Sequence, residues 1–389
     1  MAQSPPIRAS VIVDNYNYEH YVGQAIDSAL SQTYDRLEVI VVDDGSVDGS
    51  AQAIEGFGER VTAILKSNGG QASAFNAAFE RAGGEVIVFL DADDLLLPDA
   101  VANAVAAMEP DVAMVHWPLW EIDRDGERTG GVVDPDLPEG DFREIVRRLG
   151  PGVEDVWPNA ATSGNAWSRK FLEQVMPMPH VFTGTDIYLS GLAGAFGKIV
   201  TLPEPQSLYR VHGANLSGEL SFARMMELGC SLFEEQSRAL AAIYRRAGVD
   251  FDASVWPEHA WYPRIQTSLR ELEQLLEPGE AFVLVDETKW GVESEFAGHP
   301  VIPFPEHDGQ WDGWPENDQE LIAQLNRANA QGVRLIVFAW PAFWWLDEYP
   351  ELAAYLGQHS QQVLSNEHMR VFGLVSRAEA ATSRGSSRA

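Results

Sequence analysis

The chain has 389 residues, 45% of them hydrophobic, which is long enough for two domains with apolar cores. Its formal net charge of -31 at pH 7 excludes the basic footprint that nucleic-acid binding requires and disfavours docking on anionic lipid. A single cysteine, Cys230, excludes an intramolecular disulfide and a thiolate metal cluster.

The first hundred residues alternate strand and helix patterns. Apolar runs of strand length stand at 9–14, 37–42, 61–65 and 85–90. Segments with helical character follow them at 21–32, 71–82 and 99–108. Near-continuous apolar strands that alternate with helices indicate an α/β fold, with a mainly parallel sheet and helices on both faces.

The pattern changes twice further along the chain. Residues 109–215 are less regular, and from about residue 255 a smaller second α/β unit is predicted. Its expected helices are 260–276, 318–330 and 345–356, with strands at 281–286 and 333–338. We therefore predict four parts: a domain over 1–218, a helical linker over 219–254, a small α/β domain of unknown role over 255–377 and a disordered tail over 378–389.

Acidic residues follow three of the predicted strands, at Asp14, at Asp43-Asp44 and at Asp91 to Asp94. In open α/β sheets this edge is where ligands bind. Asp91 and Asp93 lie one residue apart, so both can face a hard cation that also takes pyrophosphate oxygens and assists departure of a diphosphate. The plain alternative is a solvated turn before the helix that begins near Pro98.

Several ordered motifs carry a resemblance to a known family. They are 9–17, 25–34, 41–46, 68–71 with Asn76, 89–94, 162–165 and 208–217. These segments closely resemble the family 2 glycosyltransferases over about residues 8–217. The resemblance implies a GT-A fold and inverting transfer of a sugar from a nucleotide diphosphate donor to an acceptor hydroxyl, with Mn²⁺ or Mg²⁺. It makes a UDP-sugar the default donor, leaves dTDP and GDP open, and suggests polysaccharide or glycoconjugate synthesis.

The family's donor-site residues can be carried over by position. The resemblance implies nucleotide-sugar contacts from Asp14, Tyr16, Asp44, Asn68, Gln71, Asp91 and Arg210, and metal ligation by Asp93 and His212. Arg210 would pair with phosphate through its planar fork. Five of these positions also have a structural alternative: a core aromatic for Tyr16, a helix N-cap for Asp44, a turn at Asn68, a surface loop for His212 and pairing with acids for Arg210.

Inverting transfer needs a base that takes the proton from the attacking hydroxyl. In the family this is usually the aspartate of a Glu-Asp pair at a helix start, and the matching residue here is Asp186. Thr185 replaces the preceding acid, which leaves an altered acceptor or a weakened activity open. Asp186 as a plain helix cap is the alternative.

Two aromatic features are less specific. Trp167, after the 162–165 motif, is more simply a buried residue than a sugar platform. The C-terminal unit has a set of aromatic residues for which a core or oligomer interface is favoured over a glycan grip. That set comprises Trp311, Trp314, Phe338, Trp340, Phe343, Trp344 and Trp345.

Two rival functions follow from the same residues. Thr185 favours a non-catalytic nucleotide-sugar or glycan-binding protein, whereas the intact Asp44, Asp91, Asp93 and His212 oppose it. A nucleotidyltransferase would show a Gly-rich basic loop after the first strand, and none is present. The expected partners are a nucleotide sugar and a hydroxyl acceptor, without nucleic acid or a membrane span, and homo-oligomerisation is left open. The single cysteine and lack of a targeting pattern lead us to expect the cytoplasm, free or at the inner membrane face.

Overall fold

The computed structural model describes residues 7–153, 160–179, 184–213, 221–292, 294–315 and 317–374. These residues form two compact units, one built from residues up to 213 and from 227–261, the other from 221–226 and 262–374. The tail expected over 378–389 lies outside the described residues, as do the first two residues of the expected linker.

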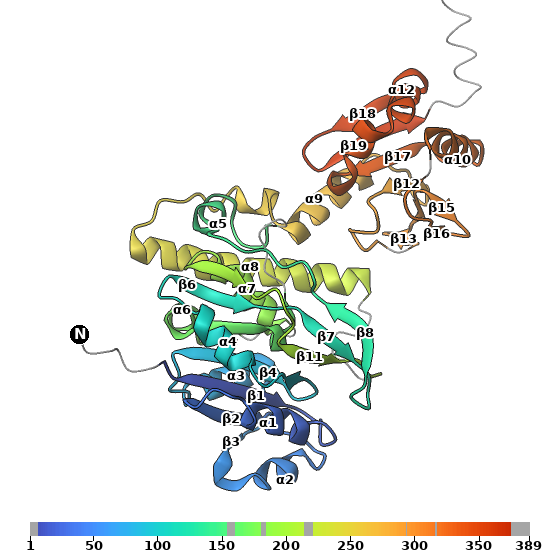
Figure 1. The fold of residues 1–389 in the computed structure, drawn as a ribbon. Coiled ribbons are helices and arrows are strands. Elements are labelled where there is room, and N and C mark those ends of the chain that lie inside the picture. The colour runs from blue at the N-terminus through green and yellow to red at the C-terminus, as the bar shows by residue number, and fades with distance from the viewer. Residues whose placement is uncertain are drawn as a thin grey trace, which may run out of the picture. The chain divides into compact units, whose positions relative to one another are not determined.

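The first unit contains a seven-stranded sheet in the order β10-β6-β9-β4-β1-β2-β3 (Figure 1). β9 pairs antiparallel with both β4 and β6, and the other pairings are parallel. The strands are β1 (Ala9–Asn15), β2 (Leu37–Asp43), β3 (Thr62–Leu65), β4 (Val86–Asp91), β6 (Val112–His116), β9 (Asn165–Ser168) and β10 (Lys198–Thr201).

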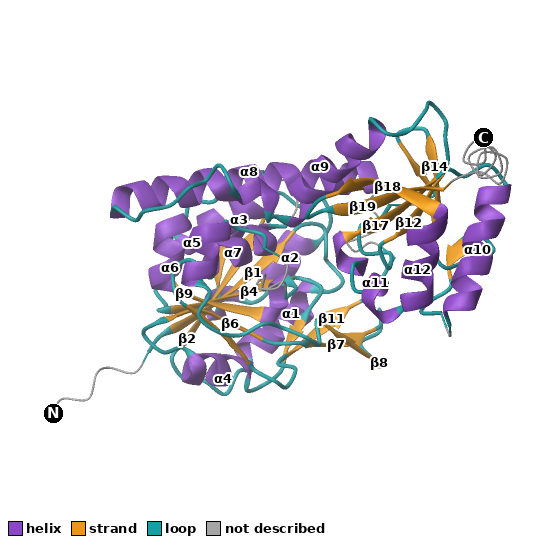
Figure 2. Ribbon diagram, turned by 90° about the horizontal axis from the view of Figure 1, so that it is seen from above, coloured by secondary structure: helices purple, strands orange, loops and turns teal. Residues whose placement is uncertain are grey.

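Helices cover both faces of this sheet (Figure 2), and each face has its own apolar cluster. One face carries α1 (Val22–Leu30), α2 (Ser50–Glu55) and α4 (Ala100–Ala107). The other carries α3 (Gln71–Phe79), α5 (Arg143–Leu149), α6 (Arg169–Val175), α7 (Thr185–Ala193) and α8 (Phe222–Ala247). The central strands are buried on both faces, which explains their continuous apolar sequences.

A four-stranded sheet in the order β5-β11-β7-β8 completes the first unit. Its strands are β5 (Leu95–Leu96), β7 (Leu119–Ile122), β8 (Arg128–Val133) and β11 (Ser207–Arg210). Short 3₁₀ turns are η1 (Gly58–Arg60), η3 (Thr162–Gly164) and η4 (Trp256–Glu258). Because β5 follows the Asp91–Asp94 segment and pairs with β11, this sheet brings the 210–212 segment to the acidic loop.

The second unit has a six-stranded sheet in the order β13-β14-β12-β17-β19-β18. Its strands are β12 (Phe282–Val285), β13 (Glu295–Phe296), β14 (His299–Pro303), β17 (Leu335–Ala339), β18 (Ser360–Ser365) and β19 (Met369–Leu374), and a separate hairpin joins β15 (Glu306–His307) to β16 (Gln310–Trp311). Its helical elements are α9 (Trp261–Glu273), α10 (Asp318–Ala330), η5 (Trp340–Ala342), α11 (Trp345–Glu348) and α12 (Pro350–His359). Leu321, Leu325, Leu352 and Leu356 of α10 and α12 pack on the sheet.

The expected α/β fold, with a mainly parallel sheet and a smaller C-terminal α/β unit, is confirmed. One correction concerns the helix expected over 345–356, which is two helices because Pro350 begins a new one after Tyr349. Within the described residues no helix has the length and apolar character to cross a bilayer.

Candidate active site

Strand pairing brings the acidic residues together at one edge of the large sheet. Asp14 at the end of β1 is in register with Asp91 at the end of β4, and Asn15 is in register with Asp43 of β2. These strands are parallel, so their carboxyl ends meet at the same edge. Three chain segments far apart in sequence therefore contribute polar side chains to one site.

Gln71, the first residue of α3, connects this cluster to α7. Its Nε2 donates to Oδ2 of Asp14 at 3.2 Å and to Oδ1 of Asp91 at 3.0 Å. Its Oε1 accepts a hydrogen bond from the hydroxyl of Thr185, the first residue of α7. Thr185 is 1% exposed, so the residue that replaces the expected acid is packed as a positioning contact.

The gathered carboxylates are electrostatically unfavourable as anions. Burial raises the pKa of Asp14 to about 7, and repulsion from Asp93 adds to the increase. Burial, followed by the charge on Asp14, raises the pKa of Asp91 well above its usual range. Oδ1 of Asp14 and Oδ2 of Asp94 are buried without a hydrogen-bond partner. Protonation of some of these carboxylates, or a bound cation, relieves the repulsion between them.

Asp93 and His212 form the pair expected to hold the metal. Nε2 of His212 lies 3.0 Å from Oδ2 of Asp93, and both side chains are largely buried. Tyr21 stacks on the imidazole with ring centroids 5.1 Å apart, and Tyr18 approaches edge-on at 5.7 Å. A carboxylate oxygen beside an imidazole nitrogen suits a divalent cation such as Mn²⁺.

Arg210 is buried beneath the acidic loop and bonded to its backbone. It is 1% exposed, and its guanidinium donates to the carbonyls of Asp93 (2.8 Å), Arg124 (3.2 Å) and Asp123 (3.3 Å) and to Oε1 of Gln24 (2.9 Å). Its backbone N–H donates to Oδ1 of Asp94 at 2.9 Å. These hydrogen bonds hold the acidic loop in shape, and the phosphate contact expected for Arg210 stays a prediction.

Asp44 is not a simple helix cap. Its carboxylate forms an ion pair with Lys66 and accepts the N–H of Gly69 at 3.1 Å and of Gly70 at 2.7 Å. The turn after Asp44 needs glycine, because Gly45 has φ +79° and a Cβ there would lie 2.5 Å from the backbone N of Asn68. The loop that contains Asn68 is thus bonded to Asp44, directly after β2, through Lys66, Gly69 and Gly70.

The two remaining donor-side residues stand at the rim of this site. Tyr16 is 45% exposed, which excludes the core-aromatic alternative, and Asn68 is exposed beside the glycine turn. Neither contacts the Asp14–Gln71–Asp91 group through a described hydrogen bond. Lys66 is the charged residue that sequence reasoning missed here, since a lone lysine after a strand carries no motif.

Asp186 lies in the first turn of α7, directly after Thr185. Burial raises its pKa to about 6, with a further contribution from the charge on Asp134. Asp186 in turn contributes to the raised pKa of Asp91, which places it in the field of the acidic cluster. Asp134, a non-glycine residue with φ +53°, follows β8 and was not anticipated, because its loop has no recognisable pattern.

The 162–165 motif holds the backbone of the acidic cluster through a hydrogen bond to Asp91. Oγ of Ser163 accepts the backbone N–H of Asp91 at 3.1 Å, and Oγ of Ser207 donates to the carbonyl of Ser163 at 2.6 Å. Nδ2 of Asn165 donates to the carbonyls of Ala160 and Ala161. Trp167 is 1% exposed, which confirms the buried reading and excludes sugar stacking.

No group of three or more His, Cys, Asp or Glu side chains in the described parts of the chain is arranged to hold a metal ion. The Asp93–His212 pair supplies two ligand atoms of suitable type, and the buried oxygen of Asp94 without a hydrogen-bond partner lies in the same loop. These oxygen and nitrogen atoms are of the types that bind a divalent cation.

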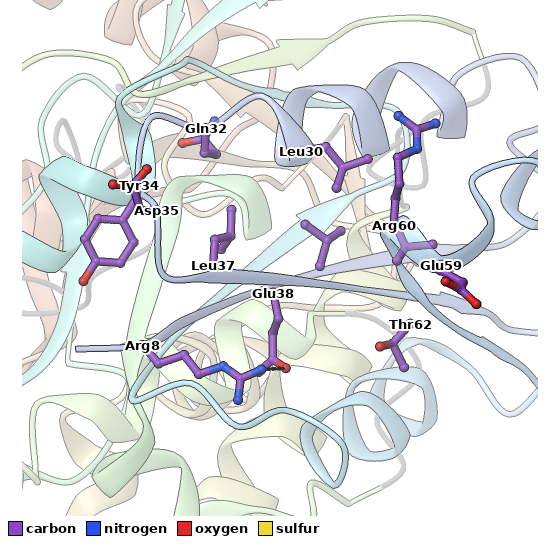
Figure 3. A pocket seen from close by; sticks show the side chains of 12 residues that line it. Arg8, Leu30, Gln32, Tyr34, Asp35, Leu37, Glu38, Glu59, Arg60 and Thr62 are labelled. Carbon is purple, nitrogen blue, oxygen red and sulfur yellow. Dashed lines mark hydrogen bonds and ion pairs between the residues drawn. The ribbon is translucent and has the colours of Figure 1, made fainter. Parts of the chain in front are cut away.

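A separate depression of about 410 Å³ lies at the opposite edge of the sheet (Figure 3). Leu37 and Thr62, the first residues of β2 and β3, contribute to its lining, so it faces the amino ends of the strands. An ion pair between Arg8 and Glu38 forms part of its lining. It contains none of the residues predicted for the site.

Comparisons with known proteins find sequence similarity to glycosyltransferases. Residues 10–162 match the family model described as Glycosyl transferase family 2. An uncharacterized glycosyltransferase of Nostoc sp. is 37% identical over 221 residues, which cover 54% of this chain and 66% of that protein. Chondroitin synthase of Pasteurella multocida is 45% identical over 95 residues, covering 24% of this chain and 10% of the synthase.

Two solved structures are similar at lower identity. TarS of S. aureus in complex with UDP-GlcNAc is 18% identical and matches 68% of this chain and 82% of its own, with a TM-score of 0.45. The mannosyltransferase PcManGT of Pyrobaculum calidifontis, in complex with GDP-Man and Mn²⁺, is 22% identical and matches 70% of this chain and 77% of its own, with a TM-score of 0.41. Over residues 10–162 the chain is therefore similar to glycosyl transferase family 2, and it covers 66% or less of the length of the sequence relatives named above.

Proposed function

We propose that this protein is an inverting glycosyltransferase that moves a sugar from a nucleotide diphosphate, by default a UDP-sugar, to an acceptor hydroxyl. The observation that carries the proposal is the carboxylate cluster at the carboxyl edge of the sheet. There Gln71 joins Asp14 to Asp91, Asp93 pairs with His212, and the charge on Asp186 acts on Asp91. Synthesis of a polysaccharide or glycoconjugate is the corresponding process.

In this proposal the donor lies across the ends of β1, β2 and β4. Asp44, fixed by Lys66 and the Gly69 and Gly70 amides, takes the base side, with Tyr16 and Asn68 at the rim. Gln71 holds Asp14 and Asp91 toward the ribose and sugar.

Asp93 and His212 would hold the divalent cation. Mn²⁺ or Mg²⁺, when bound, supplies positive charge that neutralises the leaving diphosphate. Arg210 acts indirectly, because its hydrogen bonds to the carbonyls of Asp93, Asp123 and Arg124 keep the acidic loop in place.

Asp186 acts as the general base. Its carboxylate takes the proton of the acceptor hydroxyl while that oxygen forms the new bond to the anomeric carbon, and the bond from this carbon to the diphosphate oxygen breaks with its electron pair. A pKa raised to about 6 leaves the carboxylate ionised at neutral pH and still basic enough to accept the proton. Asp134 helps to hold the pKa of Asp186 at this level.

The first test is a thermal-shift titration of the full chain with UDP, dTDP, GDP and CDP, each with and without Mn²⁺. A ligand that binds only the folded protein raises the melting temperature according to its affinity. We expect one diphosphate to stabilise the protein only with metal, and Asp93→Ala to abolish that stabilisation. Asp27→Ala, at an exposed position of α1, is the matched control.

Release of the nucleotide diphosphate from its sugar donor then separates catalysis from binding. Turnover supports the transferase, whereas metal-dependent binding without turnover by any donor supports the non-catalytic alternative, for which the Thr185 replacement is the motivating observation. Absence of stabilisation by every nucleotide would contradict the donor site.

A further inference from the structure

The second unit has its own topological switch point. β12 lies between β14 and β17, parallel to both. The chain leaves β12 to form β14 on one side and leaves β17 to form β18 and β19 on the other. Ligands of open α/β sheets bind at the carboxyl ends of strands where connections diverge in this way, which here is between β12 and β17.

The turn that follows β12 at this point is strained. Glu287 has φ +56° and Thr288 has φ +60°, a left-handed conformation that non-glycine residues rarely adopt and that is a clear outlier for a β-branched residue. The carboxylate of Asp286, 6% exposed, holds the turn by accepting the N–H groups of Thr288 and Trp290, each at 3.1 Å. Strain of this kind concentrates at functional sites.

Glu287 of the strained turn holds two tryptophans, Trp344 and Trp345, that follow β17. Oε1 of Glu287 accepts the indole N–H of Trp344 at 2.8 Å and of Trp345 at 2.7 Å. The Glu287 side chain is only 7% exposed, and Lys289 approaches its second oxygen at 3.4 Å. Trp345 is fully buried, whereas Trp344 is 41% exposed with its ring fixed through its N–H.

A second exposed tryptophan, Trp314, precedes a residue whose backbone contacts Tyr349. Trp314 is 69% exposed, and the carbonyl of its neighbour Pro315 lies 3.4 Å from the hydroxyl of Tyr349. The Tyr349 ring lies 6.4 Å from that of Trp344 and 5.2 Å from that of Trp345. Trp314 and Trp344 are the two tryptophans with the most exposed side chains in the described parts of the chain. We call Trp314, Trp344 and Tyr349 the aromatic platform.

The chemistry around the platform selects the ligand. Asp312, Asp347 and Glu348 are exposed near these rings in the sequence, and the whole chain carries a net charge of -31. Acidic surroundings disfavour phosphates, nucleic acid and anionic lipid. A neutral pyranose offers C–H groups to an aromatic face and hydroxyl donors to carboxylates.

We propose that the aromatic platform of the second unit is a binding site for a neutral oligosaccharide. A protein partner is less favoured, because Asp312, Asp347 and Glu348 stand within four residues of these rings in the sequence, and charged residues are depleted from the cores of protein interfaces. The proposal goes beyond the transfer reaction and does not depend on it. It gives the second unit a role in holding a glycan chain.

The test uses the full chain without nucleotide and measures saturation-transfer NMR and calorimetric titration with maltohexaose, cellohexaose and xylohexaose. Hexagalacturonate serves as the anionic comparison. We expect at least one neutral hexasaccharide to bind, and Trp314→Ala and Trp344→Ala each to weaken it by about tenfold, which corresponds to about 1.4 kcal/mol. Val363→Ala, at a 43% exposed position of the same unit, is the matched control and should bind normally.

Each other outcome has a defined meaning. Binding retained in Asp93→Ala separates the platform from the donor site, so failure of the transfer proposal and failure of this one remain distinguishable. Trp314 is largely exposed, so its variant tests the platform even if Trp344→Ala does not fold. The proposal is overturned if no neutral hexasaccharide binds, if both tryptophan variants bind like the native chain, if hexagalacturonate binds better, or if the platform instead joins two copies of the chain.

Discussion

At the scale of single residues, Asp186 makes the most direct prediction. Only its ionised form can accept a proton, and its pKa is raised to about 6. Activity should therefore fall as pH drops through about 6 and level off above about 7. Replacement by Asn should lower the rate of nucleotide release by about 10²–10⁴-fold. The measurement is kcat/KM for nucleotide release from pH 5 to 8, alongside nucleotide affinity.

The affinity serves as the control for this prediction. Asp186→Asn should bind the nucleotide diphosphate as tightly as the native protein, because Asp186 is assigned to the acceptor side. A variant that retains turnover, or an unchanged pH profile without the Asp186 carboxylate, would remove it from the role of base.

Thr185 leads to a second prediction at this scale. Thr185→Val keeps the shape of the side chain but removes the donor to Oε1 of Gln71, so Asp14 and Asp91 lose part of their positioning. We expect a several-fold decrease in kcat with little change in donor KM and about 1 kcal/mol lower stability. Thr185→Ser keeps the hydroxyl and should restore kcat. If Val and Ser variants behave alike, the hydrogen bond has no catalytic consequence.

At the scale of elements, Arg210 links β11 to the acidic loop. Removing its guanidinium in Arg210→Met leaves buried carbonyls without donors, and we expect a loss on the order of 3 kcal/mol in the free energy of unfolding. Urea denaturation measures this change. Arg238→Met, at a 67% exposed position on α8, should change stability by less than about 0.5 kcal/mol. If the Arg210→Met protein is as stable as the native protein but no longer binds nucleotide, Arg210 contacts the phosphate rather than only supporting the loop.

Much of the first sheet could be predicted, because buried parallel strands have continuous apolar sequences that end in polar residues. That pattern located Asp14, Asp44 and Asp91 at one edge, and the structure brings Asp14 and Asp91 together through Gln71. Burial of Arg210 could not be foreseen, since it depends on carbonyl groups of a distant loop. The same is true of Asp134, whose proximity to Asp186 arises only from tertiary packing.

Elements with weak patterns were missed for physical reasons. β8 contains Gly130 and Gly131 and is largely exposed, so it lacks the apolar alternation of a strand. β18 is mostly polar and lies at a sheet edge. The helix pattern over 345–356 continued through Pro350 because proline at a first helical turn leaves the apolar spacing of the next helix intact.

At the scale of the whole molecule, the acidic cluster makes stability depend on pH. The pKa of Asp14 is raised to about 7, and those of Asp91 and Asp94 are also raised. Above pH 4 the unfolded chain releases these protons while the folded protein keeps them, so the contribution of these groups to stability falls as pH rises toward 7.

The corresponding measurement is the melting temperature at pH 5, 6, 7 and 8, in EDTA and in MnCl₂. The cation should stabilise more at pH 8 than at pH 5, because the carboxylates near Asp93 are then ionised. Asp27→Ala should follow the native pH dependence. An equal effect of MnCl₂ at every pH would mean that the cation does not act on this cluster.

The position of β9 between β4 and β6 determines which shorter pieces of the chain can fold. β9 joins β4 to β6, yet it begins at Asn165, after the family match ends at residue 162. While a ribosome extends the chain to that point, the apolar edges of β4 and β6 have no neighbour, and unpaired strand edges invite self-association. A fragment cut at the end of the family match should therefore aggregate on expression. The segment matched by the family model is therefore shorter than the unit that can fold.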